Sequence, residues 1–241
     1  MTIGYEQTYQ LRTDDFDRYS RLQPASVLDV FQDVAGVSAE LTPGMTWREI
    51  TDAGLVWVVT RIKYEVLDTP KLHEQVIART WPLAPNRLGF QRDYTIKSLD
   101  GRLLVRGSSD WVMMDINTRS FASSLDFYKG PYDFSTETAF DTKLRRIRPF
   151  KPTDEGRIIT PEFTDIDING HVNNTRYASY VMNTWVPNED EAIKTFQIDY
   201  RHEIRPGTSI RVHMQHKDGE VNFMGMSADD EHMFAAKIEL A

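Results

Sequence analysis

Residues 164–177 read Thr-Asp-Ile-Asp-Ile-Asn-Gly-His-Val-Asn-Asn-Thr-Arg-Tyr, and this stretch does most to decide the fold and the chemistry. Polar side chains recur here at every second position, and alternation in an extended backbone would place them on one face. A carboxylate, an amide and an imidazole on one face are suited to acyl-transfer or hydrolytic chemistry. The four residues in this pattern are Asp165, Asp167, Asn169 and His171.

The residues that follow have the spacing of a helix. Ala178, Val181, Met182 and Trp185 fall at i, i+3, i+4 and i+7, which predicts a helix from Val172 with one buried face. Free N–H groups at its start would favour an anion or a developing oxyanion. The alternative is a structural loop, because Asp and Asn often cap helices and Asn-Gly is a common turn pair. The spacing alone leaves both interpretations open.

Composition narrows the class of protein. The chain has 241 residues, of which 40% are hydrophobic and 27% charged, as in ordinary soluble domains. It has no apolar run that could cross a bilayer and no signal peptide, so we expect a cytoplasmic protein without a membrane partner. A net charge of −8 argues against nucleic acid as the partner. The absence of cysteine excludes disulfides, zinc-thiolate sites and a cysteine nucleophile.

The order of predicted elements suggests an internal repeat. Each half contains a strand, one apolar helix and four further strands joined mainly by hairpins. An antiparallel sheet of this size would bury the helix by wrapping around it, which predicts an α+β fold. We expect domains at 1–120 and 153–241, joined by an ordered connecting segment at 121–152. The first half has strands at 5–11, 55–66, 74–81, 88–98 and 103–116 and a helix from Pro24 to Leu41; the second has strands at 157–160, 192–203, 208–216, 220–227 and 232–240.

Four blocks of the sequence resemble signature segments of the acyl-[acyl carrier protein] (acyl-ACP) thioesterase family, which includes the plant enzymes that terminate fatty-acyl chains. The blocks occur in family order, and the match in architecture covers nearly the whole chain. They are Gly-Leu-Val-Trp-Val-Val-Thr-Arg at 54–61, Ser-Ser-Asp-Trp-Val-Met-Met-Asp at 108–115, the opening stretch at 165–177, and Ile-Asp-Tyr-Arg-His-Glu at 198–203.

The resemblance implies a tandem (double) hotdog fold, in which each half is an antiparallel sheet wrapped around a long central helix. It also implies an enzyme of fatty acid biosynthesis and lipid metabolism that releases free fatty acid from acyl-ACP. The acyl carrier protein, an acidic and transient partner, and the fatty acyl thioester would be its ligands. Because the chain lacks the transit peptide of plant members, it looks like a bacterial relative.

The resemblance also implies the site residues. Asp167, Asn169 and His171 match the family's Asp-x-Asn-x-His motif, and Glu203 matches its catalytic glutamate. The first half has no such motif, since no Asn or His follows its two Asp residues at 15 and 17 with the right spacing. A fused pair of this kind is therefore expected to keep one site of two.

One departure from the family pattern concerns the nucleophile. Many plant relatives have a cysteine directly after the glutamate, and here that position is Ile204. We therefore expect water activated by Glu203 or Asp167, or direct attack by a carboxylate. Asn169 would hold the water or the carbonyl, and His171 would orient the glutamate or protonate the leaving thiolate. The backbone N–H groups at 172–174 are the expected oxyanion donors.

Glu203 has a structural alternative. Strict strand alternation places it on the face of Gln197, Asp199 and Arg201, which could simply be solvated.

Several further residues are candidates for substrate binding. Trp57, Met113 and Met114 would line an acyl tunnel, with core packing as the alternative. Asn173 and Asn174 would be helix caps or would support the bound substrate.

A basic cluster lies at the end of the connecting segment. Five of the nine residues 143–151 are basic and none is acidic, which fits either a solvated linker or a docking patch for an acidic partner. Under the family resemblance, Arg145, Arg146 and Arg148 would dock the carrier protein, with Arg87 and Arg92 as weaker candidates.

No cofactor and no metal are expected, because His213 and His216 would point to opposite faces of a strand. An acyl-CoA thioesterase of the same fold is the closest alternative function. A non-catalytic hotdog that binds acyl thioesters and a dehydratase are further alternatives. Acyl length and the pairing of whole chains into a homodimer stay open.

Overall fold

A computed structural model gives the fold and describes residues 4–86, 89–123 and 134–241. The chain divides into two compact units. We call Met1–Thr13 with Val30–Leu144 the N-terminal unit, and Asp14–Asp29 with Arg145–Ala241 the C-terminal unit. In the part of the chain that the structure describes, no helix has the length and apolar character needed to cross a membrane.

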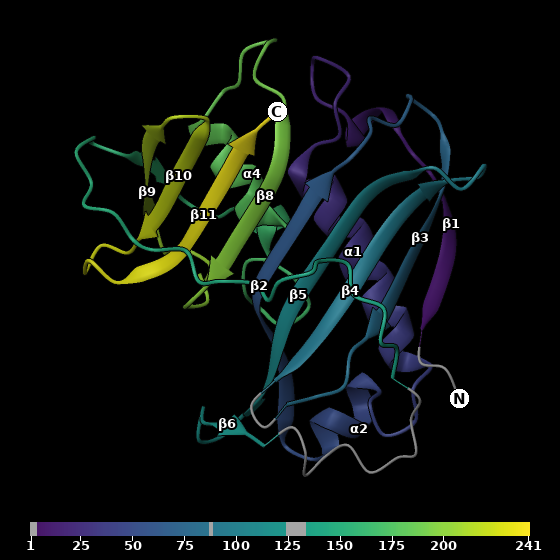
Figure 1. Cartoon of the computed structure of the whole chain (residues 1–241). Coiled ribbons are helices and arrows are strands. Elements are labelled where there is room, and N and C mark those ends of the chain that lie inside the picture. Colours follow the sequence, from purple (N-terminus) through teal and green to yellow (C-terminus); the bar gives the residue numbers. More distant parts are fainter. Residues whose placement is uncertain (1–3, 87–88, 124–133) are drawn as a thin grey trace. The chain divides into compact units, whose positions relative to one another are not determined.

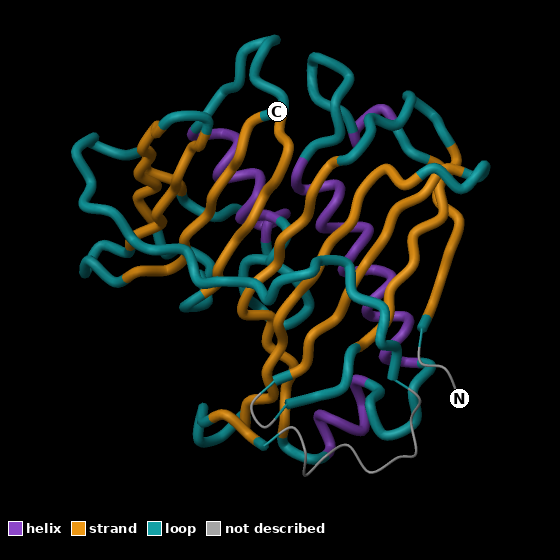
Figure 2. The backbone as a smooth tube through the Cα atoms, in the orientation of Figure 1, coloured by secondary structure: helices purple, strands orange, loops and turns teal. Residues whose placement is uncertain are grey.

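The N-terminal unit is an antiparallel sheet with helices (Figures 1 and 2). Its strands follow the order β1-β3-β4-β5-β2, and the short β6 pairs with β5. Two helices, α1 (Pro24–Glu40) and α2 (Trp47–Asp52), accompany the sheet, although residues of α1 up to Asp29 group with the other unit. The strands are β1 (Tyr5–Gln10), β2 (Leu55–Val66), β3 (Gln75–Pro82), β4 (Phe90–Ser98), β5 (Leu103–Asp115) and β6 (Phe121–Ala122).

The C-terminal unit repeats this plan. Its strands follow the order β7-β9-β10-β11-β8, which is the N-terminal order when strands are matched along the chain. The repeat of α+β units predicted from the sequence is therefore confirmed. The elements are β7 (Arg157–Ile159), α4 (Arg176–Thr184), β8 (Ile193–Tyr200), β9 (Ile210–Lys217), β10 (Glu220–Met226) and β11 (His232–Leu240).

Each sheet receives a large aromatic side chain over a glycine. A Cβ atom on Gly107 would lie 2.2 Å from the ring of Phe31 in α1, and that ring stacks on Tyr94 with centroids 4.3 Å apart. In the C-terminal unit a Cβ on Gly225 would lie 2.2 Å from the ring of Phe234. Glycine at these two strand positions therefore makes room for the core.

Buried aspartates anchor the described part of the connecting segment. The Asp93 carboxylate accepts a hydrogen bond from the Ala139 N–H at 2.7 Å, and Asp199 accepts one from the Ile147 N–H at 2.8 Å. Residues 124–133 of this segment lie outside the described residues. The domain boundaries at 120 and 153 stay a prediction.

The strands agree closely with prediction, but the opening stretch does not. Phe163–Asp165 forms a short 3₁₀ helix, and Ile166 pairs with Val172 across a tight turn. The prediction that 165–171 is extended, with four polar side chains on one face, is therefore wrong. Gly170, with φ of 79°, allows the turn, and α4 begins at Arg176 rather than at Val172.

Candidate functional site

The turn that carries the predicted motif is fixed by its own main chain. The Asp167 N–H donates to the His171 carbonyl at 2.9 Å, and the Gly170 N–H donates to the Asp167 carbonyl at 3.0 Å. The Asn173 N–H donates to the Asp165 carbonyl at 2.8 Å and closes the loop. We call residues 165–173 the motif loop.

Both carboxylate oxygens of Asp167 make contacts within this loop. Its Oδ1 accepts a hydrogen bond from the Asn169 N–H at 2.8 Å, and its Oδ2 lies 3.5 Å from the Asn169 Nδ2. The Asn169 side chain lies at the exposed tip of the turn, next to Ile168, which is 94% exposed. Asp167 thus shapes the turn and orients the Asn169 amide.

His171 and Glu203 meet although 31 residues lie between them in the sequence. The His171 Nε2 lies 3.1 Å from the Glu203 Oε2, and the side chains are 32% and 25% exposed. The other carboxylate oxygen of Glu203 lies 2.7 Å from a terminal nitrogen of Arg205. Glu203 is therefore mostly buried, and it is held from two sides by an imidazole and a guanidinium. The sequence analysis missed Arg205.

An irregularity after β8 explains why Glu203 faces the motif loop. The N–H groups of Arg201 and His202 both donate to the Met233 carbonyl, at 3.0 and 3.1 Å, so two residues of one chain segment oppose one residue of β11. An extra residue of this kind shifts the alternation that follows it. The predicted grouping of Glu203 with Gln197 and Asp199 on one face is therefore wrong.

Tyr177, in the first turn of α4, supports the Glu203 backbone. Its hydroxyl accepts a hydrogen bond from the Ile204 N–H at 3.1 Å, and Tyr177 is only 2% exposed. Burial raises the pKa of Tyr177 strongly, and the charges of Glu203 and Asp167 raise it further. The phenol is therefore neutral and near both carboxylates. The sequence analysis missed this residue too, and its only local signal was the place of Tyr177 at the end of the motif.

The expected oxyanion donors are mostly occupied. The Val172 N–H donates to the Ile204 carbonyl at 2.9 Å, and the Asn173 N–H bonds within the loop. These two donors are therefore not available to a ligand. The Asn174 N–H has no acceptor among the described residues, while its carbonyl accepts the Tyr200 hydroxyl at 2.9 Å. The Asn173 Oδ1 accepts the Thr175 N–H at 2.9 Å, which stabilises the turn into α4.

The first half of the chain contains a second loop with the same backbone. Residues 15–23 make the same main-chain hydrogen bonds as 165–173, and Phe16 pairs with Leu22 as Ile166 pairs with Val172. Here Arg21 replaces the histidine and its Nε lies 3.1 Å from the Asp17 Oδ2. The sequence showed that the functional side chains are missing there, but not that the loop geometry is kept.

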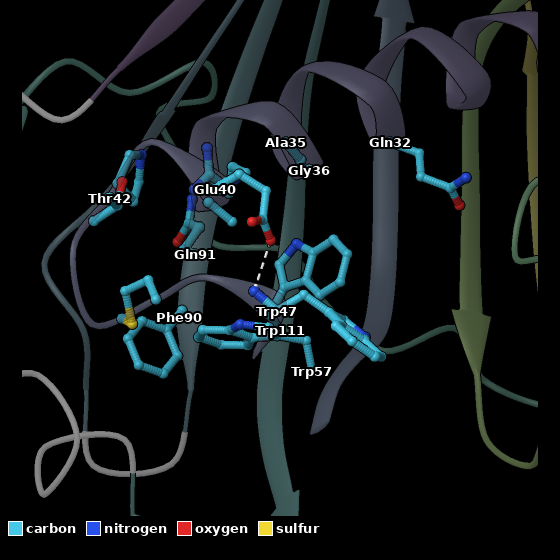
Figure 3. Close-up of a pocket in the computed structure, with 14 residues that line it drawn as sticks. Gln32, Ala35, Gly36, Glu40, Thr42, Trp47, Trp57, Phe90, Gln91 and Trp111 are labelled. Atoms are coloured by element: carbon cyan, nitrogen blue, oxygen red, sulfur yellow. Dashed lines mark hydrogen bonds between the residues drawn. The ribbon is translucent and has the colours of Figure 1, made fainter. Parts of the chain in front are cut away.

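The N-terminal unit contains a cavity of about 230 Å³ beside α1 (Figure 3). One side is formed by small residues of α1, namely Ala35, Gly36 and Ala39, and the other is largely aromatic. The complete lining is Gln32, Ala35, Gly36, Ala39, Glu40, Thr42, Met45, Trp47, Trp57, Pro82, Phe90, Gln91, Arg92 and Trp111.

The three residues predicted to line an acyl tunnel differ in their position relative to this cavity. Trp57 lines it, and its ring meets Phe90 edge to face at 4.7 Å. Met113 is fully buried in a core cluster against which Trp57 packs, and Met114 is not among the lining residues. Sequence analysis missed the role of α1 in the cavity.

The short helix α2 contributes Trp47 to the lining of the cavity. The Trp47 N–H at the start of α2 donates to the Glu40 Oε1 at 2.6 Å, and Figure 3 shows Glu40 reaching from α1 to this point. Thr46 and Glu49 form a capping box that fixes the start of α2. The Trp47 side chain is thereby held at the cavity.

The basic residues expected to dock a partner are exposed. Arg145, Arg146 and Arg148 surround the buried Ile147, and among the described residues none of the three has an acidic partner. Arg87 lies outside the described residues, and Arg92 lines the cavity instead.

No group of three residues that could ligate a metal is found in the part of the chain that the structure describes. His213 is buried, and its Nδ1 lies 2.7 Å from the Asp154 Oδ1.

The chain is similar to known proteins over most of its length. Residues 3–131 match the acyl-ACP thioesterase N-terminal domain, and residues 151–239 match the C-terminal domain. A palmitoyl-acyl carrier protein thioesterase of Arabidopsis thaliana is 29% identical over 64% of this chain and 40% of its own length. A dodecanoyl-[acyl-carrier-protein] hydrolase of Umbellularia californica is 28% identical over 69% of this chain and 46% of its own length. The chain spans about half the length of the curated relatives it matches.

Two solved structures share the fold. A 12:0-ACP thioesterase from Umbellularia californica has a TM-score of 0.87 at 24% identity, with 100% of this chain and 98% of that chain covered. An acyl-ACP thioesterase from Bacteroides thetaiotaomicron has a TM-score of 0.85 at 21% identity, with 99% and 98% covered. The tandem hotdog predicted from the sequence is thereby confirmed.

Proposed function

Because the chain belongs to the acyl-ACP thioesterase family, we propose that it hydrolyses the thioester of an acyl-ACP and releases a free fatty acid and the carrier thiol. The observation that carries this proposal is the contact between His171 and Glu203 beside the Asp167–Asn169 turn. These four residues lie in the part of the chain that matches the family's C-terminal domain.

Glu203 is the base in this mechanism. Its carboxylate removes a proton from a water molecule as the water oxygen attacks the thioester carbonyl carbon, which turns the carbonyl oxygen into an oxyanion. Asp167 has a different part in the proposal: it shapes the turn by accepting the Asn169 N–H, and it orients the Asn169 amide. His171 and Arg205 orient the Glu203 carboxylate.

The oxyanion is stabilised by the Asn174 N–H and the Asn169 amide, and one such donor typically contributes about 10²–10³ in rate. When the tetrahedral intermediate collapses, the carbon–sulfur bond breaks and the thiolate receives the proton held by Glu203. No covalent acyl-enzyme on cysteine is formed, since the chain contains no cysteine.

The cavity of the N-terminal unit receives the acyl chain in this proposal. Its walls are apolar and aromatic, as expected for an alkyl ligand.

The acidic carrier protein docks on Arg145, Arg146 and Arg148, because exposed cations steer an acidic partner and speed its association. Charge reversal at the three positions should lower kcat/KM for acyl-ACP and flatten its salt dependence. Reversal of the exposed Lys217 in β9 is the matched control. Unchanged rates and an unchanged salt slope after the triple reversal would refute this docking site.

The decisive experiment compares one acyl chain on acyl carrier protein and on CoA, with wild type, Glu203→Gln and Asp167→Ala. We expect Glu203→Gln to lower kcat by about 10²–10⁴. Glu220→Gln, which alters a carboxylate paired with Lys237 in the same unit, controls for the charge change. Faster turnover of the CoA ester would support the acyl-CoA alternative, and near-normal turnover by Glu203→Gln would exclude Glu203 as the base.

A further inference from the structure

Arg201 is a half-buried arginine that lacks the partners found for similar residues. Arg61 pairs with Asp110 at 3.0 Å, and Arg106 pairs with Glu65 at 2.6 Å. The Arg201 guanidinium, by contrast, makes no hydrogen bond or ion pair with the described residues, and its Nε is buried. A buried cationic donor without an acceptor is unfavourable, and such groups usually have a ligand or water partner.

A second unpaired donor lies next to it. His232 begins β11, and its Nδ1 is also buried without a partner among the described residues. Burial lowers the pKa of His232, and the positive charge of Arg201 lowers it further. The Arg201 N–H donates to the carbonyl of Met233, the residue after His232.

Two adjacent nitrogen groups of this kind fit an anion with several oxygens. The planar guanidinium binds phosphate through two parallel hydrogen bonds, and an imidazole nitrogen can supply a third. A bound phosphate would provide acceptors for both buried nitrogens. It would also supply a negative charge to pair with the Arg201 guanidinium.

The basic segment is bonded to the strand that leads to Arg201. Two positions before Arg201, Asp199 holds the Ile147 N–H, and Gln197 donates to the Arg145 carbonyl at 2.8 Å. The segment with the exposed Arg145, Arg146 and Arg148 is thus tied to β8 directly before Arg201 (Figure 1).

We propose that Arg201 and His232 form a phosphate site that binds the phosphodiester of the pantetheine arm on the carrier protein. This proposal rests on the proposed function, because the carrier's arm is what presents the thioester. The basic segment attracts the acidic carrier, and the Arg201–His232 pair then fixes the phosphate of its arm. Coenzyme A carries a phosphate at the same end of its pantetheine, so the site recognises a chemistry that both carriers share.

The test measures binding of 4′-phosphopantetheine and of pantetheine, which lacks the phosphate, by isothermal titration calorimetry. Wild type should bind the phosphorylated compound at least about tenfold more tightly. In Arg201→Gln and His232→Gln this preference should fall to about twofold or less, while pantetheine binding stays unchanged. Lys194→Gln, which removes an exposed cation from β8, is the matched control and should keep the preference.

Three outcomes of binding measurements would overturn the proposal. An unchanged preference for phosphate in Arg201→Gln would show that the pair binds no phosphate. Equal weakening of both compounds would indicate a structural role. Equal weakening of the carrier protein with and without its arm would show that Arg201 contacts an acidic side chain instead.

Hydrolysis assays distinguish the sources of the phosphate. A matching loss of kcat/KM for acyl-ACP and acyl-CoA in Arg201→Gln supports a site for the shared pantetheine phosphate, whereas a loss confined to acyl-CoA overturns its assignment to the carrier's arm. Because the binding measurement needs no turnover, an inactive wild type that still prefers 4′-phosphopantetheine would refute the proposed function and leave the phosphate site standing.

Discussion

Tyr177→Phe tests whether Glu203 is positioned from the start of α4. The substitution removes one oxygen atom, which accepts the Ile204 N–H at 3.1 Å. The ring itself stays packed against its aromatic neighbours, including Tyr200 at 5.2 Å and Phe234 at 5.3 Å. The change is therefore confined to a single buried hydrogen bond next to Glu203.

The expected loss of stability follows from the burial of both the donor and the acceptor of this hydrogen bond. Tyr177 is 2% exposed and Ile204 is 0% exposed, so water cannot replace the lost hydroxyl. A buried N–H without an acceptor costs about 1–3 kcal/mol. With a denaturant slope of about 2 kcal/mol per molar urea, a loss of about 2 kcal/mol lowers the unfolding midpoint by about 1 M.

Activity should fall by more than stability alone explains. Displacement of a catalytic group by about 1 Å can cost about 10²-fold, so we expect kcat to drop about ten- to hundredfold with a smaller change in KM. The measurements are urea unfolding and steady-state hydrolysis of acyl-ACP under conditions where the variant is folded.

Tyr94→Phe is the matched control. Its hydroxyl makes a buried hydrogen bond to Ser109 at 2.9 Å in the N-terminal unit, so the variant should lose comparable stability and keep kcat. The positioning role of Tyr177 would be refuted if Tyr177→Phe kept wild-type kcat, or if Tyr94→Phe lowered kcat as much.

Three further predictions concern other parts of the chain. Gly36→Leu should stabilise α1 by about 0.5–1 kcal/mol, because nothing lies within 4 Å of a Cβ at this position and glycine is a poor helix former. Gly36 lines the cavity, so the added side chain should shift the preferred acyl length down in a chain-length panel, and an unchanged profile would contradict the assignment of the cavity. Asp93→Asn tests the buried carboxyl group, whose pKa burial raises in the folded state. The stability that this group contributes is therefore full below its unfolded-state pKa and declines as pH rises through its folded-state pKa. Over that pH range the urea midpoint of the variant should decline less than the midpoint of the wild type. Arg21→Met should lower the free energy of unfolding by about 1–3 kcal/mol, since Arg21 is 19% exposed and also donates to the Glu189 carbonyl at 3.3 Å. Arg48→Met, at an ion pair whose arginine is 86% exposed, is the control and should change stability by less than about 0.5 kcal/mol. Similar effects of the two substitutions would argue against a stabilising role for the Arg21 contacts.

The sequence predicts what local patterns determine. β2 spans Leu55–Val66, the range predicted from its β-branched and aromatic residues, and α1 begins at Pro24 as predicted. The repeated order of elements follows from the same local signals. These features depend on residues close together in the chain, so they can be read from one sequence.

The errors arise where distant main-chain contacts decide the geometry. The motif loop was expected to be extended, but Gly170 and the cross-turn bond from Asp167 to His171 fold it back. The orientation of Glu203 depends on two N–H groups that share the Met233 carbonyl on β11. The contact between Tyr177 and Ile204 joins a helix to a segment beyond the following strand. None of these partners can be paired from spacing alone.

The two copies of the loop separate scaffold from chemistry. In both, the second Asp accepts the N–H two residues later at 2.8 Å, and the residue at the tight turn has a positive φ, 61° at Ser20 and 79° at Gly170. The loop backbone therefore does not require Asn169 or His171. What differs is the partner at the last polar position: in the first copy Arg21 is held by the loop's own Asp17, while His171 reaches outward to Glu203. Replacing Arg21 with His would consequently free Asp17 without supplying a counterpart of Glu203, so the motif loop, and not the loop at 15–23, determines where a site of this kind can form.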